Sequence, residues 1–389
     1  MRRRFPYRRL FFMGMRNRSS AAGRLVQLSF QFTSLDLSSR AIFLRHALIA
    51  TNPHICPQTA LALWSKPGIR VPLIDLAPGP ICMQRPLHIG TRGSDLALVQ
   101  ARTVAANLIR AHGLDETQVE IVPIETTGDL MQDQRLADIG GKGLFTQEIE
   151  DALFDKRIDI AVHSMKDMPT VLPDGLIIDC VLEREDPRDA FISSSARTLD
   201  SLPQGAKFGT SSLRRASQVL ARRPDLEIVP FRGNVGTRLR KLEDGVASAT
   251  LLAMAGLNRL GLTNVVTDPL EPEIMLPAVA QGIVGIERRV DDEETAHLLA
   301  PIHHVETAIV MAAERAFLSA LDGSCRTPLA GFATFDKNRL HFRGQILTPD
   351  GKIVHETERS GSAALAAALG GDAASELKAK GGPAFFATW

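Results

Sequence analysis

Short apolar strands alternate with amphipathic helices along residues 87–262, and no other feature of the sequence constrains the fold as strongly. In a first block, strands are predicted at 87–91, 119–126 and 159–163 and helices at 94–113 and 143–157. In a second block, strand and helix again follow in turn at 206–212, 213–224, 226–233 and 237–245. Such alternation predicts mostly parallel sheets with helices on both faces. Ligands of these sheets bind at the carboxyl ends of the strands, in the loops that enter helices.

A third block begins near residue 303 and follows a different pattern. A long helix predicted at 304–323 precedes three strands predicted at 331–335, 339–347 and 352–361. Pro-Asp-Gly at 349–351 suits a hairpin turn between the last two. The sequence therefore predicts an α/β protein whose parallel sheets are followed by a small α+β C-terminal domain.

Residues 1–85 are a different kind of sequence. They hold 12 Arg and 1 Lys against 2 Asp, which leaves 32 basic and 42 acidic residues for the rest of the chain. An Arg-rich segment poor in acids is typical of an organellar transit peptide. The alternative is that Met83 is the true start and that the preceding residues are an over-extended reading frame. On either interpretation we expect this extension to be disordered or absent from the mature protein.

Composition and cysteine spacing argue against several classes of protein. Aromatic residues make up 5% of the chain, too few for a nucleic-acid binder that stacks bases. No apolar run approaches the roughly 20 residues of a membrane helix. No CxxC or His/Cys spacing indicates zinc, and His303–His304 lacks a third ligand, so we expect no metal. Cys180 lies in an apolar run and is expected to be buried, which leaves Cys325 unexplained.

Basic residues gather in four loops that lead into predicted helices. These loops contain, in order, Arg92 with Ser94, Lys142, Ser212 with Arg214 and Arg215, and Arg232 with Arg238. The N–H groups at a helix N-terminus together with a cation make an anion site, and the planar Arg fork matches carboxylate or phosphate. Each residue alone also fits an ordinary solvated charge, but four such loops in one chain favour an anionic ligand.

This pattern is compatible with three functional classes. The first is an enzyme that acts on a polyanionic small molecule. The second is an anion-binding module built like a two-lobed solute-binding protein. The third is nucleic-acid binding through the Arg-rich segment 214–240, against which the acidic charge of the main body and the sparse aromatics both argue.

The stretch AVHSMKDMPT at 161–170 supplies the best catalytic candidates. Lys166 and Asp167 are adjacent where the buried strand Asp-Ile-Ala-Val ends, the position at which α/β sheets place their ligands. A Lys-Asp pair in a loop is otherwise an ordinary surface pair. Its place in the chain makes this one a candidate for chemistry.

Together these motifs resemble the porphobilinogen deaminase (hydroxymethylbilane synthase) family. In the order of that family the chain contains HIGTRGSDLALVQ, GGKGLF, AVHSMKDMP, EREDPRDAF, GTSSLRR, RGNVGTRL, AGLNRLGL, LPAVAQGIVGIE and the DGSC loop. The match is close over about residues 86–335 and looser beyond them. Residues 1–85 have no counterpart in the bacterial-type pattern.

The resemblance implies a fold of three domains. Two are lobes like those of a periplasmic solute-binding protein, and the third carries the cysteine. We expect residues 86–182 and 283–302 to form the first domain, 183–282 the second and 303–389 the third.

The resemblance also implies a reaction and a cofactor. The family is a transferase that carries a dipyrromethane cofactor, here linked through a thioether to Cys325. Four molecules of porphobilinogen are deaminated and joined head to tail on it, and hydrolysis releases the linear tetrapyrrole hydroxymethylbilane. The expected setting is haem-type tetrapyrrole biosynthesis in a cytoplasmic monomer, or in an organellar matrix if residues 1–85 are a transit peptide, without nucleic-acid or membrane partners.

The family motifs assign roles to residues of this chain. Asp167 is expected to stabilise the cationic azafulvene left when ammonia departs and to help move protons, beside Lys166, with Asp129 as a second candidate. The residues expected to bind cofactor or substrate carboxylates are Arg92, Lys142, Lys166, Arg214, Arg215, Arg232, Arg238 and Arg259. Neutral contacts are expected from Ser94, Ser164, Ser212, Gly233 and Gln281, and Gln281 with Gly282 is also expected to shape the crossover into the first domain.

Two positions depart from the family pattern. Asp138 stands where a basic residue is common, so that loop is expected to contribute through Lys142 alone. Asn258 replaces a commoner Lys, although Arg259 remains. The leading alternative is a degenerate member that binds a pyrrole or another anion without turnover, against which the retained Lys166, Asp167 and Cys325 argue.

Overall fold

The computed structural model describes residues 85–127, 146–324 and 327–389. The predictions made for the first 84 residues, and those for Asp129, Asp138, Lys142 and Cys325, lie outside these ranges. Among the described residues no helix is both long enough and apolar enough to cross a membrane.

The first sheet has five strands, and α2 (Asp95–His112) and α4 (Gln147–Phe154) pack against it. Its strands, in spatial order, are β2 (Val119–Ile124), β1 (Leu87–Arg92), β3 (Ile160–Ser164), β10 (Val284–Arg289) and β4 (Leu176–Val181). β1 runs parallel to both β2 and β3, whereas β10 is antiparallel to its two neighbours. The predicted strand–helix alternation is confirmed here, and Ser94 caps α2 by accepting a hydrogen bond from Ala97 N (3.4 Å) as expected.

The second sheet repeats this topology with α5 (Leu213–Arg222), α6 (Val235–Glu243) and α7 (Met254–Arg259). Its strands, in spatial order, are β7 (Glu227–Val229), β6 (Lys207–Gly209), β8 (Ala249–Ala253), β5 (Asp189–Ser193) and β9 (Asp268–Leu270). β5 is the antiparallel strand. In each sheet the antiparallel strand is therefore the first strand in the sequence after the chain crosses over from the other sheet. The predicted mostly parallel lobes are confirmed, with one reversed strand apiece.

Helix α6 begins earlier than predicted. Sequence analysis started this helix at Thr237, but it begins at Val235. Asn234 caps it, because its side-chain oxygen accepts the N–H of Thr237 (2.8 Å). The two glycines around Asn234 suggested a turn and concealed the cap.

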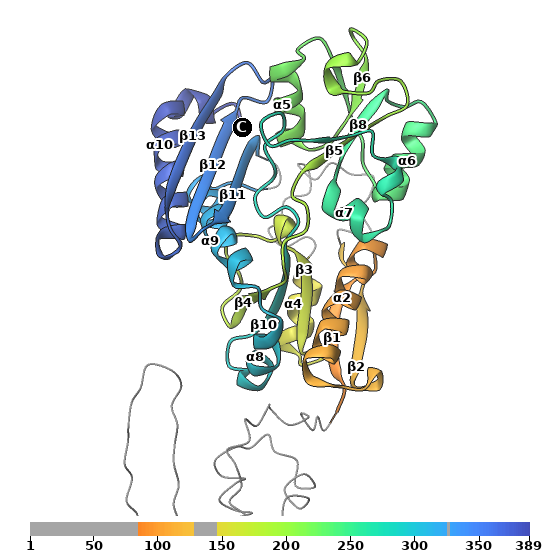
Figure 1. The fold of residues 1–389 in the computed structure, drawn as a ribbon, viewed down its shortest axis with the longest axis vertical. Helices are drawn as coiled ribbons and strands as arrows, with labels where there is room; N and C mark the ends of the chain where they lie inside the picture. The colour runs from red at the N-terminus through yellow and green to blue at the C-terminus, as the bar shows by residue number, and fades with distance from the viewer. Residues whose placement is uncertain (1–84, 128–145, 325–326) are drawn as a thin grey trace, which may run out of the picture. The chain divides into compact units, whose positions relative to one another are not determined.

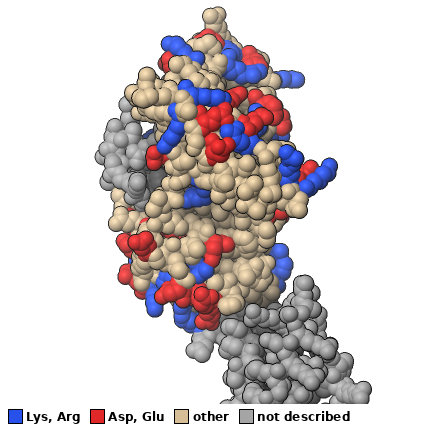
Figure 2. Space-filling model, turned by 90° about the vertical axis from the view of Figure 1, so that its left-hand side faces the viewer, with Lys and Arg blue, Asp and Glu red and all other residues tan. Residues whose placement is uncertain are grey.

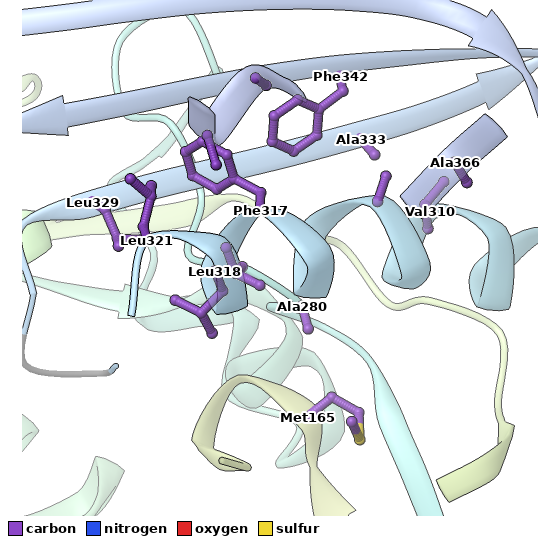
Figure 3. Packing of buried hydrophobic residues seen from close by; sticks show 14 of the residues in the cluster. Met165, Ala280, Val310, Phe317, Leu318, Leu321, Leu329, Ala333, Phe342 and Ala366 are labelled. Atoms are coloured by element: carbon purple, nitrogen blue, oxygen red, sulfur yellow. The ribbon is translucent and has the colours of Figure 1, made fainter. Parts of the chain in front are cut away.

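The third sheet is antiparallel, in the order β11 (Leu329–Asp336), β12 (Arg339–Leu347) and β13 (Val354–Ser362). Helices α9 (Val305–Ala320) and α10 (Ala366–Phe386) pack against each other and against this sheet (Figure 1). Its core centres on Phe317 and Phe342, whose ring centroids lie 5.0 Å apart. Figure 3 shows that the same apolar cluster reaches Met165, beside β3, and Ala280. The α+β part of the prediction is confirmed.

Each sheet takes all its strands from one of the segments that sequence analysis assigned to a domain. On this basis we propose the same boundaries: 86–182 with 283–302, then 183–282, then 303–389. The chain crosses between the first two sheets twice, between β4 and β5 and between β9 and β10.

Glu314, on α9, joins these crossing segments to the third sheet. Its carboxylate is fully buried and forms an ion pair with Arg184 (2.6 Å) of the first crossing. It also accepts the backbone N–H of Ala280 (2.6 Å) from the second crossing and that of Ala333 (2.7 Å) from β11. A buried carboxylate is tolerated only when its oxygens are paired in this way. One side chain thus holds three chain segments together.

The crossing segments also lie close to each other. Gly282 has a φ of +90°, and a Cβ at this position would come within 2.3 Å of the Glu185 carbonyl oxygen. Gln281 is buried and donates from its amide nitrogen to the carbonyl of Pro187 (2.7 Å). These contacts account for the expectation that Gln281 and Gly282 shape the crossover.

Replacing Glu314 by Gln is expected to destabilise the protein by about 3 kcal/mol, because the amide must set an NH₂ group against a backbone N–H and leaves Arg184 without its counter-charge. Urea unfolding measures the change. The control is Glu306→Gln, an exposed position on the same helix, expected to shift stability by no more than about 0.5 kcal/mol. Equal unfolding midpoints for the two variants would contradict the role assigned to Glu314.

Candidate active site

A pocket lies at the carboxyl ends of β1 and β3, where sequence analysis expected the ligand. Residues that line it include Arg92, Ser94, Gln100, Thr146, His163, Ser164 and Asp167. The parallel pairing of β1 with β3 brings these strand ends to one edge of the sheet. Arg92, Ser94, Ser164 and Asp167 come from distant parts of the sequence and line one pocket.

The Lys166–Asp167 pair sits in a single turn of 3₁₀ helix (Met165–Asp167) directly after β3. Met165 and Met168, on either side of the pair, are buried in the core shared with the third domain. Met165 N donates to the carbonyl of Ile283 (3.0 Å). The apolar anchors fix the turn, and Asp167 remains exposed to the pocket's solvent.

Arg315, on α9, braces the same turn from the third domain. Its guanidinium donates to the carbonyl of Pro169 (2.5 Å) and, at 3.4 Å, to that of Met168. Burial lowers the pKa of Arg315. Sequence analysis missed this residue because it lies within a helix of the third block, away from every loop that carried a motif.

Arg214 and Arg215 are both buried at the start of α5 and share one carboxylate, Asp189. Arg215 reaches Asp189 Oδ1 (2.6 Å) and Arg214 reaches Oδ2 (2.7 Å). Although burial acts in the opposite direction, the two guanidinium groups lower the pKa of Asp189 to about 2. Two cations against one carboxylate leave one positive charge in excess. Asp189 stands in the quoted EREDPRDAF motif, but its role was not foreseen.

Further cations surround Asp167. The pKa of Arg238 is lowered to about 10, chiefly by burial and next by the charge of Arg215, with Asp167 and Arg232 acting on it in opposite directions. Arg238 Nε is buried without a hydrogen-bond partner in the described part of the chain. A guanidinium in this condition is incompletely satisfied and fits an anionic ligand.

Lys166 belongs to the same cluster. Burial lowers the pKa of Lys166 to about 8, with Asp167 opposing and Arg215 reinforcing the shift. The interaction places Lys166, from the first sheet's loop, near Arg215 from the second sheet. The cation cluster, defined here as Lys166, Arg214, Arg215, Arg232 and Arg238, thus draws on both sheets.

The serines have local partners in the structure. Ser94 and Ser212 cap α2 and α5, and Ser212 accepts the N–H of Arg215 (3.4 Å). Ser164 forms a hydrogen bond with Gln100 (2.8 Å), a residue that sequence analysis missed because it lies inside a helix. Gly233 has a φ of +120°, which permits the sharp turn before α6.

Two predicted substrate residues are attached to the crossing segments. Arg259 donates to the Gly282 carbonyl (2.7 Å), and burial lowers its pKa. Gln281 donates to Pro187, as described above. Their roles toward substrate stay predictions. Cys325 and Lys142 lie outside the described residues; the residues on either side of the cysteine segment, Ser324 and Thr327, are joined by a hydrogen bond from Thr327 Oγ1 to Ser324 O (2.7 Å).

No group of three or more His, Cys, Asp and Glu residues suited to a metal ion occurs in the described part of the chain. On the face drawn in Figure 2, Lys and Arg side chains are interspersed with Asp and Glu and form no continuous basic stripe.

Comparison with known proteins gives consistent matches. Residues 87–297 match the family model "Porphobilinogen deaminase, dipyromethane cofactor binding domain", and residues 308–379 match "Porphobilinogen deaminase, C-terminal domain". The porphobilinogen deaminase of Paracoccus denitrificans is 59% identical over 306 residues, covering 79% of this chain and 97% of that protein. The chloroplastic porphobilinogen deaminase of Oryza sativa is 53% identical over 305 residues, covering 77% of this chain and 85% of that protein.

Similarity to solved structures is weaker. A periplasmic substrate-binding protein of an ABC transporter from Coxiella burnetii aligns with a TM-score of 0.35 and 14% identity, covering 56% of this chain and 90% of that one.

The lowered pKa of Lys166 predicts a pH-dependent stability. Because the folded-state pKa is about 8 and the ordinary value is 10.5, the unfolded chain binds more protons between these values. Stability relative to Lys166→Met should therefore rise with pH across that window and be lowest below it, where the buried ammonium is charged. Urea unfolding of cofactor-free Cys325→Ser protein, with and without Lys166→Met, measures this.

The matched control for this measurement is Lys352→Met, at an exposed lysine of the third domain. A pH dependence that is the same for Lys166→Met and Lys352→Met would contradict the effect of burial on Lys166.

Proposed function

The chain belongs to the porphobilinogen deaminase family, and from this premise we propose that its cation cluster binds the carboxylates of the dipyrromethane cofactor and of the growing chain, with Asp167 at the reacting carbon. The enzyme is a hydroxymethylbilane synthase, a transferase of tetrapyrrole biosynthesis. It joins four porphobilinogen molecules on the cofactor and releases hydroxymethylbilane by hydrolysis.

The observation that carries the proposal is the imbalance of charge around Asp167. Lys166, Arg214 and Arg238 all have lowered pKa values, chiefly because they are buried, and because Arg215 lies close to each of them. Such a cluster is unfavourable until anions enter it. Each pyrrole of cofactor or substrate carries an acetate and a propionate, which supply those anions.

The residues present fit the cofactor. Arg238 Nε is buried and unpaired in the described chain, and the Asp189 pair leaves one positive charge over. We assign the cofactor carboxylates to Arg214, Arg215, Arg232, Arg238, Lys166 and Lys142, and its neutral contacts to Ser164, Ser212 and Gly233. Cys325 holds the cofactor covalently. When bound, the cofactor supplies the free pyrrole carbon to which the first substrate is joined.

Arg92 and Ser94 face the same pocket as Asp167 and are assigned to the substrate. Arg92 ends β1 and Ser94 begins α2, so a carboxylate here meets a guanidinium and a helix N-terminus together. Arg259 and Gln281 are assigned to later positions of the growing chain, since both lie at the crossing segments.

Asp167 is assigned the central chemical role. The loss of ammonia leaves a positive charge on the pyrrole of the substrate, and a carboxylate at hydrogen-bond distance from the pyrrole N–H stabilises it. The acetate and propionate groups of the cofactor and substrate are assigned to Lys166, Arg215 and Arg238, away from Asp167. The charge of Asp167 can therefore act on the reacting ring. The braced turn between Met165 and Met168 keeps this geometry fixed.

The second candidate is a binding protein that holds such anions without turnover. The retained Asp167 and Cys325 argue for the enzyme. We further propose that the protein acts as a cytoplasmic monomer without nucleic-acid or membrane partners, or in an organellar matrix if residues 1–85 direct it there. The mixed charge on the face drawn in Figure 2 argues against a nucleic-acid partner on that face.

The covalent attachment predicts a mass difference. Purified wild-type protein should carry the extra mass of two linked pyrroles, and Cys325→Ser should lack it. Intact mass spectrometry measures both. Cys180→Ser is the control, because Cys180 is buried in the first sheet and should leave the added mass in place. An active protein without the added mass would refute the attachment.

Asp167→Asn should keep the fold and the cofactor mass but lower kcat by about 100-fold or more, because an amide cannot stabilise the developing cation. Hydroxymethylbilane formation is measured at saturating porphobilinogen. Asp174→Asn, at an exposed position on the next loop, should keep full turnover. Near-normal kcat in Asp167→Asn would overturn the role of Asp167.

A further inference from the structure

Three polar side chains are buried on the α4 side of the first sheet, next to the pocket. His163 on β3 and Glu287 on β10 are 6% and 0% exposed, and Glu150 on α4 is 7% exposed. His163 Nε2 lies 3.0 Å from Glu287 Oε2. Neither the binding of carboxylates nor the role of Asp167 makes use of these groups.

Strand register brings the first two together. In the antiparallel pairing of β3 with β10, His163 lies opposite Gly285 and Ala161 opposite Glu287. Directly paired residues share a face, so His163 and Glu287 are diagonal neighbours on one side of the sheet. Gly285 offers no side chain between them. Helix α4 covers this face through Ile149 and Ala152, which pack with Ala161.

The cluster holds fewer hydrogen-bond partners than its buried oxygens require. Glu150 Oε1 and Glu287 Oε1 are buried without a partner in the described part of the chain. Buried carboxylate oxygens without partners are costly, so this setting is unfavourable for negative charge. Burial raises the pKa of Glu150 against the opposing effects of a hydrogen bond from Thr146 and of His163, and the negative charge of Glu287 adds to the rise. The Glu150 carboxyl therefore holds its proton more tightly than an exposed carboxyl would.

The other charged groups on this face are already engaged. Glu148 accepts the N–H of Thr127 (2.8 Å). Arg289 is paired with Asp292 (2.7 Å) and donates to the carbonyl of Leu153 on α4 (2.8 Å). Asp151, the next acidic residue on α4, is exposed and adds to the negative potential at Glu150. Arg92 and Asp167 line the same pocket as His163.

The cluster is connected to the candidate active site, because His163 and Thr146 line the same pocket as Asp167. We propose that a cluster of His163, Glu287 and Glu150 shares a proton during the condensation. In this cluster His163 exchanges a proton with the pocket, and the two glutamates position His163 and balance its charge. This inference rests on the proposed function.

The proton balance of the reaction gives such a cluster a task. In each condensation the carbon–nitrogen bond of a protonated aminomethyl group breaks, and ammonia leaves with the bonding electrons. A new carbon–carbon bond forms to a pyrrole carbon, which then loses its proton. Ammonia takes up one proton and departs as ammonium. One proton thus moves from carbon to ammonia, and a cluster that accepts it and returns it ends each cycle as it began.

The test compares kcat, KM and the pH profile of kcat for His163→Gln, Glu287→Gln and Glu150→Gln, each normalised to cofactor content by intact mass. We expect kcat to fall about 10–100-fold in the first two and less in Glu150→Gln, which mimics a protonated carboxyl, with KM changed by less than about 3-fold. The pH profile of kcat should change shape in each. His88→Gln is the matched control, since His88 pairs with Glu120 (3.4 Å) on the exposed edge of the same sheet.

A structural role and a proton-transfer role give different results. Imidazole added to His163→Gly should restore turnover if His163 exchanges protons with the pocket, and it should not restore Asp167→Asn. Variants that lose thermal stability but keep the wild-type kcat and pH profile would overturn the inference. Variants that lose turnover without a change in the pH profile of kcat and without rescue by imidazole would overturn it as well. If His163→Gly fails to fold, the pH profiles of the two glutamate variants decide. Wild-type protein that makes no hydroxymethylbilane would instead refute the proposed function.

Discussion

The structure depends on an unfavourable gathering of positive charge that the chain itself only partly neutralises. Within the residues that the structure describes, Asp189 is the one carboxylate that pairs with Arg214 and Arg215, and it is fully buried. Without it, two guanidinium groups at the start of α5 would be buried side by side and unpaired, which proteins do not tolerate. With it, the lobe folds yet keeps a net attraction for anions. The same three charges, those of Arg214, Arg215 and Asp189, therefore affect both the stability of the lobe and its attraction for anions.

The third domain contacts both the first lobe and the segments that connect the two lobes. Glu314 and Arg315 are consecutive residues of α9, and they reach different targets. Glu314 holds the crossing segments, and Arg315 holds the turn that carries Asp167. The apolar core of the domain continues to Met165 on the other side of that turn (Figure 3). Helix α9 therefore positions Asp167, the proposed catalytic acid, relative to the connection between the two lobes, and so supports a side chain that lies on a loop.

Much of the fold was predictable because it follows from local patterns. The strand–helix alternation, the caps Ser94 and Gly113, and the antiparallel third domain were all readable as periodicity and capping. The loops with Arg92, Ser94, Ser164 and Asp167 were placed correctly at strand ends. Their meeting in one pocket follows from parallel pairing alone.

What could not be predicted depends on long-range pairing. Arg214 and Arg215 looked like free anion ligands, because nothing local reveals that Asp189 lies across the sheet from them. Arg315 and Glu314 are ordinary helix residues until the crossing segments pack on them. The pairing of His163 with Glu287 requires the register of two strands more than 120 residues apart. Such partners leave no spacing signal in a single sequence.

The position of β10 has a consequence for how the protein is made. β10 lies between β3 and β4 in the first sheet, yet it follows the whole of the second lobe in the chain. As the polypeptide leaves the ribosome, β4 emerges without the strand it pairs with, while all five strands of the second sheet become available in one continuous stretch. The second lobe can therefore finish folding first, and the first lobe must wait, with one edge of β3 open, until residue 289 has been synthesised.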